Sequence, residues 1–216
     1  MFTALLAATI VAATYPLPHH FEYGFTMNTG VIAHEGGAKA DAGSIAVDVV
    51  KVLDDTGTLV RVSEQSPARA SQPPSTCVAY GTGLVQCDPI DTITVEEMCL
   101  LRVLGRNFLN WSEIDKQHAW HNGASDGHAR ESNDYRITGQ TNGLFQISFE
   151  RVLDVQGSDG YVSTTQGRLS YDDARAVPAF LTQKTVTRPQ SGDRPAVVEQ
   201  LTLSLRDGAA PSTRNS

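Results

Sequence analysis

The stretch from Ile93 to Trp111 is the one segment that indicates a helix in a chain otherwise patterned as strands. Thr94 and Glu97 have the spacing of a capping box, in which the threonine hydroxyl accepts from a helical amide and the glutamate accepts from the cap amide. Gly105 is the expected stop, because glycine adopts the left-handed cap conformation at little cost. We therefore predict a helix near residues 94–106, too short to be stable without packing against the rest of the protein.

One face of this predicted helix is apolar. Its apolar residues recur at steps of three and four, which is the period of a buried helical face. They are Val95, Met98, Leu101, Leu104 and Phe108. Because the flanking sequence is typical of strands, we expect this face to pack against a sheet.

The flanking sequence predicts an antiparallel sheet. Apolar and polar residues alternate from Phe21 to Met27, and the later strands are separated by connections too short for parallel pairing. Gln117 to His121 is a candidate short strand, and Asn122 to Asp126 is a candidate turn. The fold class predicted is mainly β: a strongly twisted antiparallel sheet, half-barrel or barrel, of about nine to ten strands around one short amphipathic helix.

The carboxyl-side half of the chain, from His128 to Leu205, is a predicted meander of strands. With the helix before it, this meander resembles in architecture the envelope carrier proteins of the LolA and LolB kind. In those proteins a half-barrel grips a helix over an apolar cavity. The resemblance implies a binding space between the sheet and the helix.

The amino-terminal residues resemble a secretory signal. Phe2 to Ala13 form an apolar run without a charged residue, and Val11 and Ala13 are small enough for signal peptidase. The alternative is a buried N-terminal helix or strand. The run is shorter than the ~20 residues of a transmembrane helix. We therefore expect a signal peptide at 1–13, a single β-rich domain at 14–207, a disordered tail at 208–216, and a secreted or periplasmic protein.

The cysteines favour the same oxidising location. If Gly81, Thr82 and Gly83 form the loop of a hairpin, Cys77 lies directly opposite Cys87, within reach of a disulfide. We predict that this bond forms. Cys99 is left over on the helix, where we expect it to be a small buried apolar residue rather than a nucleophile.

Histidines are the candidates for catalysis or metal binding. His118, His121 and His128 lie close in sequence, and three imidazoles can bind zinc. If Gln117 to His121 is a strand, however, His118 and His121 point to opposite faces. Surface histidines are therefore the favoured interpretation, and no catalytic residue, metal or cofactor is assigned.

Aromatic residues give a mild hint of a binding site. Phe108, Trp111 and Trp120 surround the irregular segment after the helix and could line the mouth of a cavity, or simply close the core. The formal net charge of −7 and the absence of a basic run argue against a nucleic-acid partner.

We therefore hypothesise a secreted or periplasmic, non-catalytic protein of the bacterial envelope. It binds a lipid or other apolar or amphipathic small molecule, or an envelope protein, between the sheet and the helix. The first alternative is a structural or interaction module without a ligand, favoured by an exposed edge strand. The second is a metal-dependent hydrolase that uses the three histidines.

Overall fold

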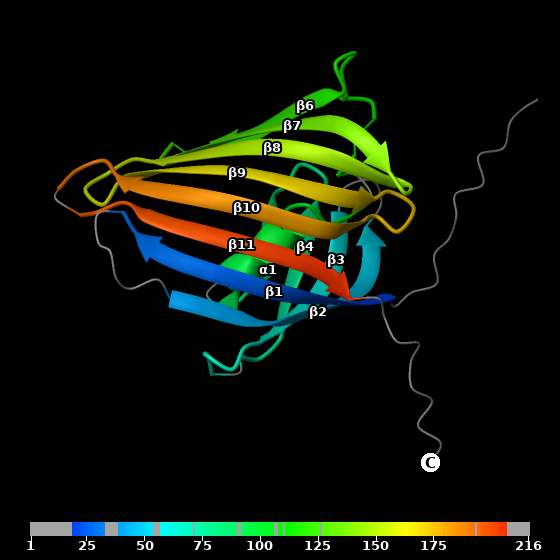
Figure 1. Ribbon diagram of the computed structural model, residues 1–216, viewed down its shortest axis with the longest axis horizontal. Coiled ribbons are helices and arrows are strands. Elements are labelled where there is room, and N and C mark those ends of the chain that lie inside the picture. Colours follow the sequence, from blue (N-terminus) through cyan, green and yellow to red (C-terminus); the bar gives the residue numbers. More distant parts are fainter. Residues whose placement is uncertain are drawn as a thin grey trace, which may run out of the picture.

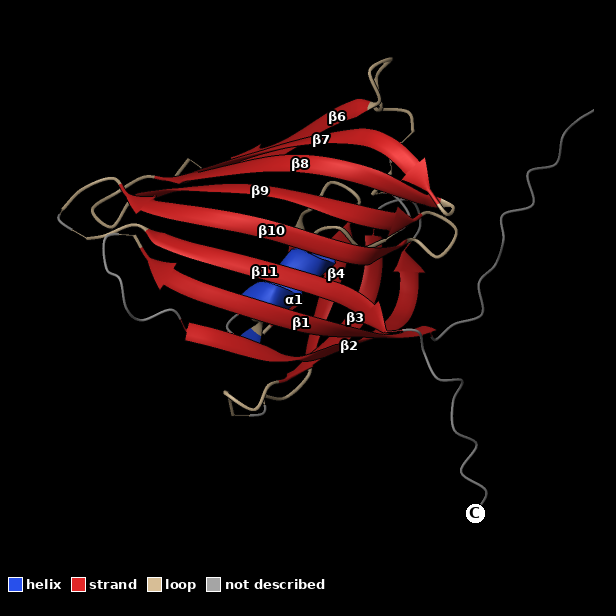
Figure 2. Cartoon of the chain, in the orientation of Figure 1, coloured by secondary structure: helices blue, strands red, loops and turns tan. Residues whose placement is uncertain are grey.

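The described part of the chain forms one strongly curved antiparallel sheet with a single short α-helix against its inner side (Figure 1). The computed structural model describes residues 19–32, 39–53, 57–70, 72–89, 92–105, 108–109, 111–125, 127–192 and 194–206. The predicted signal peptide and tail lie outside these residues. Figure 2 shows that the strands bend around the helix and partly hide it.

Eleven strands form this sheet within the described residues, in the order β5-β4-β3-β2-β1-β11-β10-β9-β8-β7-β6, and the sheet does not close. The strands and the helix have these bounds: β1 His19–Val31, β2 Lys39–Leu53, β3 Gly57–Gln65, β4 Ser75–Tyr80, β5 Val85–Asp88, α1 Val95–Leu101, β6 Ala119–Ser125, β7 Ala129–Thr141, β8 Leu144–Val155, β9 Tyr161–Asp172, β10 Val177–Pro189 and β11 Val197–Arg206.

Two meanders build the sheet, and the first and last strands join them. β1 to β5 form one meander and β6 to β11 the other, because each short connection returns the chain antiparallel to the strand before it. β1 pairs with β11 at the centre, with Phe25 opposite Leu203 and Met27 opposite Leu201. β5 and β6 are therefore the two edges of the sheet.

The mainly β fold with one helix is as predicted, but the described residues form eleven strands instead of nine to ten, and the predicted strand at Gln117 to His121 has different bounds. The expected turn at Asn122 to Asp126 is wrong, since β6 continues to Ser125. Polar pairing with β7 explains the difference: the Asn133 side-chain amide donates to Asn122 Oδ1 at 2.9 Å. Pairing with β7 holds residues 122–125 in the β conformation, which their polar sequence does not indicate.

The helix begins as predicted and ends earlier. Thr94 Oγ1 accepts from the Glu97 amide at 3.2 Å, and Glu97 Oε2 accepts from the Thr94 amide at 2.9 Å, which completes the capping box. The expected end near residue 106 is wrong, because the α-helix stops at Leu101. Gly105 does adopt a positive φ of 107°, but in the turn beyond the helix, where its amide donates to Ala176 O at 3.0 Å.

The core lies between the inner face of the sheet and the helix. Strand residues alternate between buried and more exposed, so every second side chain points to the inner side of the sheet. Ile45, Val47 and Val60 have no exposed surface. On the helical segment Leu101, Leu104 and Phe108 are buried as predicted, whereas Val95 is 50% exposed. No helix in the described part of the chain is long and apolar enough to cross a membrane.

The predicted cystine is present. Cys77 on β4 pairs directly with Cys87 on β5, and their sulfur atoms are bonded. Gly83 in the connecting turn has a φ of +80°, as the predicted loop requires. The bond ties the edge strand β5 to the rest of the sheet.

Candidate functional site

The predicted aromatic residues divide between the core and the surface. The Phe108 ring lies 5.7 Å from the Trp120 ring and 5.3 Å from the Tyr135 ring, between centroids, and all three are buried. Trp111 is 51% exposed and contacts Phe145 instead. The structure therefore brings Phe108 and Trp120 together and places Trp111 apart from them.

This aromatic cluster extends along the inner face of the sheet. Tyr171 and Phe149 complete it, with ring centroids 5.0 Å from Phe108 and 5.9 Å from Tyr135 respectively. The Tyr171 hydroxyl donates to Gly105 O at 2.6 Å, so the cluster also fixes the turn that follows the helix. Burial raises the pKa of both Tyr135 and Tyr171, so both phenols are neutral at physiological pH.

Some polar atoms of this interior have no hydrogen bond. Trp120 Nε1 and the Tyr23 hydroxyl are buried and have no hydrogen-bond partner among the described residues. Burial raises the pKa of Tyr23 far above its usual value, which keeps that hydroxyl protonated. Buried polar groups are nearly always hydrogen-bonded, so each of these two groups can still donate a hydrogen bond.

A polar network lies beside the aromatic cluster. Arg102 Nη1 contacts Glu131 Oε1 at 2.6 Å, and Arg151 Nε donates to Asn133 Oδ1 at 2.8 Å. Cys99 is buried nearby, as predicted, and its sulfur accepts from Gln183 Nε2 at 3.0 Å. Burial raises the pKa of the Cys99 thiol, so this thiol is not activated as a nucleophile.

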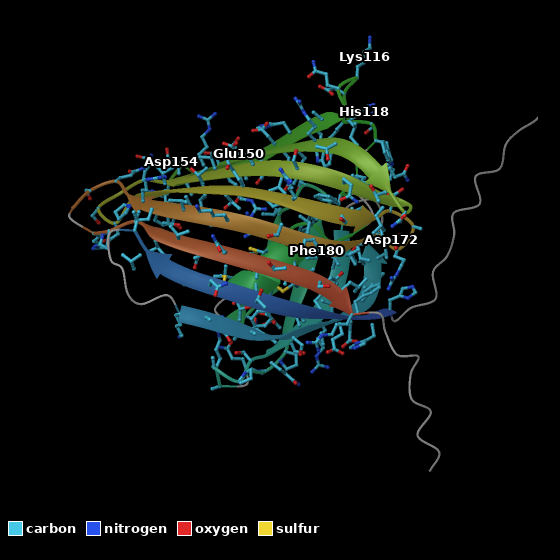
Figure 3. The ribbon with its side chains drawn as sticks, viewed as in Figure 1. Lys116, His118, Glu150, Asp154, Asp172 and Phe180 are labelled. Carbon is cyan, nitrogen blue, oxygen red and sulfur yellow. A yellow bond between two sulfur atoms is a disulfide. The ribbon has the colours of Figure 1, made fainter. Side chains whose placement is uncertain are left out.

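The three candidate histidines lie at the surface. His118 is in the turn before β6 with a positive φ of 58° (Figure 3), and His128 is exposed before β7. His121 points to the outer face, where its Nδ1 lies 2.9 Å from Asp134 Oδ1. Within the described ranges no cluster of three or more histidine, cysteine or acidic side chains could hold a metal ion.

The outer face of the sheet carries a row of polar side chains that the sequence did not indicate. Six residues occupy paired positions on six adjacent strands, and none of them makes a side-chain hydrogen bond or ion pair with another described residue. In sheet order this polar row is Thr26, Thr202, Thr182, Arg168, Ser148 and Arg136.

A second row runs beside the first and is also polar. Gln166 Nε2 reaches Glu150 Oε2 at 3.4 Å, and Asp134 pairs with His121, so this row is partly bonded to itself. Figure 3 labels Glu150 on its strand in the upper part of the sheet. The members are Asn28, Gln200, Lys184, Gln166, Glu150 and Asp134.

All members of the two rows except Thr26 line an open hollow of about 1270 Å³ on the outer face, which we name the outer trough. Glu113, Asp115 and Gln117 line it at the β6 end. A second hollow of about 870 Å³ adjoins it at Thr202 and has mostly small residues on its floor, among them Gly24 and Ser44. The trough can therefore accommodate an extended molecule that crosses several strands.

The outer trough could not be found from sequence, because its side chains come from six strands whose pairing is set at long range. Each contributing residue is an ordinary polar position of an alternating strand. Only the register, such as Ser148 opposite both Arg136 and Arg168, aligns them. The aromatic residues after the helix are a stronger local pattern, and for that reason the sequence predicted a ligand site in the interior instead.

Comparisons with known proteins give a general likeness only. No protein-family model matches the sequence, and no curated protein matches it. Among solved structures, the S-type phycobiliprotein lyase CPES from Guillardia theta is similar over 88% of each chain, with a TM-score of 0.33 and 10% sequence identity. A likeness of this degree assigns neither residues nor a ligand, so the candidate site depends on the geometry of this chain alone.

Proposed function

We propose that this is a non-catalytic binding protein, and that the outer trough holds an extended, hydroxyl-rich ligand, with an oligosaccharide as the class that fits best. The observation that carries the proposal is the polar row of six side chains without partners across six strands. At the ~4.8 Å spacing of paired strands, the row spans roughly 24 Å.

The chemistry of the trough favours such a ligand. Threonine and serine hydroxyls both donate and accept, guanidinium groups only donate, and the amides of Asn28, Gln166 and Gln200 do both. Sugar hydroxyls have the same dual capacity along a whole chain. Side chains of both charge signs border the trough, among them Arg168 and Glu150. The trough therefore does not require a ligand with a strong charge of one sign.

The trough contains one histidine–carboxylate pair, His121 with Asp134, and its contacts agree with a binding role. His121 bonds to Asp134, but no serine, threonine or cysteine of the described chain bonds to that imidazole. A nucleophile within hydrogen-bond reach of its base is the usual sign of covalent catalysis. We also propose a secreted or periplasmic location, which the Cys77–Cys87 disulfide supports.

A glycan microarray covering neutral and acidic oligosaccharides tests the proposal, followed by calorimetry with the best ligand. Arg168→Met should weaken that affinity at least tenfold and leave the melting temperature unchanged, since Arg168 has no partner among the described residues. Arg188→Met is the control, because Arg188 is an exposed arginine on the adjacent strand β10 and does not line the trough. No glycan binding, or equal affinity of both variants, would exclude the oligosaccharide.

A second candidate function is the binding of an amphipathic ligand between the sheet and the helix. The unpartnered Trp120 Nε1 and Tyr23 hydroxyl favour it, because an apolar ligand with acceptor atoms would complete their hydrogen bonds. Native mass spectrometry of protein secreted into an oxidising compartment is the test. A non-covalent mass that disappears on denaturation, and is reduced by Trp120→Phe, supports this candidate, whereas equal native and denatured masses reject it.

A further inference from the structure

Phe180 is an exposed aromatic residue on the polar outer face of the sheet (Figure 3). It is 41% exposed, whereas the next residue, Leu181, is buried, as alternation along a strand requires. Among the described phenylalanine, tyrosine and tryptophan residues only Trp111 is also exposed, and its ring contacts Phe145. The Phe180 ring has no aromatic or cation–π contact with another described residue. The ring is therefore free to contact a bound molecule.

Small hydroxyl-bearing residues surround Phe180. Ser204 of β11 and Ser170 of β9 lie directly opposite it on the two neighbouring strands. Thr182, two residues further along β10, is a member of the polar row of the outer trough. The Ser170 hydroxyl donates to Gln146 Oε1 at 2.9 Å and can still accept. The aromatic ring thus rises from a surface of short side chains whose hydroxyls lie around it.

The second hollow begins beside Phe180. Its floor follows Phe180 at paired positions on the next three strands. In sheet order these floor residues are Ser204, Gly24 and Ser44. Thr202 lines both this hollow and the outer trough. A chain of sugar rings that lies in the trough can therefore continue past Phe180 into the second hollow.

Arg206 supplies hydrogen-bond donors to the second hollow, which it also lines. Its guanidinium lies against Gly24, where a Cβ would be 3.2 Å from Arg206 Nε, and glycine permits this close approach. Arg206 Nη1 donates to Glu22 Oε1 at 2.6 Å, which leaves other N–H groups of the guanidinium for a ligand. The hollow beside the aromatic ring is therefore suited to a molecule rich in acceptor oxygens.

An aromatic ring among hydroxyls fits a pyranose. The faces of a pyranose carry C–H groups, which are attracted to the negative face of an aromatic ring, and its edge carries hydroxyls that donate and accept. A hydrocarbon chain would cover Phe180 but leave the surrounding hydroxyls without partners. A nucleotide base would also stack, but its phosphates are repelled by a chain of formal net charge −7.

We infer that one pyranose ring of the trough ligand stacks on Phe180, and that the next ring of the same oligosaccharide lies in the second hollow. We name Phe180 together with the second hollow the Phe180 site. The inference rests on the proposed function, because Thr182 and Thr202 make the Phe180 site continuous with the outer trough. The stacked ring is one that has a whole face of C–H groups, as glucose has.

Cellohexaose, chitohexaose and maltohexaose are the probes, and calorimetry measures their affinities. At least one should bind. Phe180→Ala and Phe180→Leu should each weaken the tightest of the three at least fivefold, whereas Phe180→Trp should bind it about as well as the wild type. Leucine keeps the apolar bulk but has no aromatic face, so wild-type affinity of Phe180→Leu would overturn the stacking.

Val50→Ala is the control for this series, with thermal unfolding to check that every variant is folded. It removes an exposed apolar side chain from β2 that lines neither hollow, and it should leave the affinity unchanged. If Val50→Ala weakens the probe as much as Phe180→Ala does, binding is not located at Phe180 and the inference is wrong.

A filled hollow tests the second ring. Ser44→Leu places a bulky side chain on the floor of the second hollow and should weaken the same probe at least fivefold. Ala46→Leu is its matched control, because Ala46 lies two residues along the same face of β2 and does not line the hollow. Equal affinities of the two variants would contradict a sugar ring in the second hollow.

Fluorescence of Phe180→Trp gives a direct readout. The new indole should shift its emission to shorter wavelength when the probe saturates the site, beyond any shift in the wild type, since the stacked ring excludes water from it. An unchanged emission at saturation would overturn the inference.

Arg168→Met separates failure of this inference from failure of the proposed function. If Arg168→Met weakens a bound glycan and Phe180→Ala does not, the trough binds it without Phe180, so the inference is wrong and the proposed function stands. If none of the three hexasaccharides binds, the inference is rejected, and the wider glycan array decides the proposed function by itself.

Discussion

Arg69 holds three carboxylates at once, in the connection between β3 and β4. Its Nε lies 2.8 Å from Asp41 Oδ2, its Nη1 lies 3.0 Å from Glu64 Oε1, and its Nη2 lies 2.5 Å from Glu96 Oε1. The three acidic side chains are at most 7% exposed, whereas that of Arg69 is 34% exposed. These acids raise the pKa of Arg69, mainly through Glu96. One cation thereby joins β2, β3 and the start of the helix.

Replacement of Arg69 by methionine should destabilise the fold by about 2 kcal/mol. Loss of one partner of a fully buried ion pair costs about 3–5 kcal/mol, and we expect less because water screens the exposed part of Arg69. Urea denaturation at pH 7 measures the change. Arg61→Met is the control, since Arg61 is exposed and has no ion pair among the described residues. An equal, small loss in both variants would show that the three-carboxylate contact contributes nothing.

At the scale of elements, the helix depends on its first turn. Thr94 accepts from the Glu97 amide and also donates to Glu64 Oε2 at 2.6 Å, so one hydroxyl both caps α1 and ties it to β3. Thr94→Ala should lower the free energy of unfolding by about 1–2 kcal/mol, since loss of a cap typically costs about 1 kcal/mol. Thr94→Ser keeps the hydroxyl and should remain near wild type in the same urea denaturation. If the free energy of unfolding falls equally in both variants, the effect comes from loss of the threonine methyl group rather than of the hydroxyl.

Elements set by local interactions were predictable from sequence. The capping box spans three residues, and the cystine hairpin is fixed by its three-residue loop, so Thr94, Cys77 and Cys87 were placed correctly. The end of the helix was not predictable, because the turn after Leu101 is held by Tyr171 of β9 and by Ala176 in the turn between β9 and β10. Strand β6 was shortened in the prediction for the same reason: its partner on β7 decides its length.

At the scale of the whole molecule, the sequence predicted the fold class but not how the strands align. Alternation identifies which residues of β1 or β8 face the core, since it is a property of each strand alone. It does not reveal that β1 pairs with β11, or that Arg168 and Arg136 flank Ser148. The outer trough and the Phe180 site both arise from that alignment, which is why residue patterns pointed to the aromatic interior instead.

The buried and half-buried acids predict how stability depends on pH. Burial raises the pKa of Glu64, Glu97 and Glu199 above the ordinary 4.5, and for Glu199 the nearby Glu96 adds to the rise. An acid whose pKa is higher in the folded state binds its proton more tightly there, so folding gains stability as pH falls toward 4.5. Asp41 acts in the opposite sense, because hydrogen bonding chiefly from Ser66 lowers its pKa below 3.8, and its contribution is lost only at lower pH.

The free energy of unfolding should therefore rise from pH 7.5 toward about 5, which urea denaturation across that range would measure. Glu199→Gln should flatten the rise, because the amide carries no charge at any of these pH values. Glu113→Gln is the control: it removes the same formal charge from an exposed position without an ion pair. If both variants flatten the curve equally, the pH dependence comes from general repulsion in a chain of net charge −7 rather than from burial of Glu199.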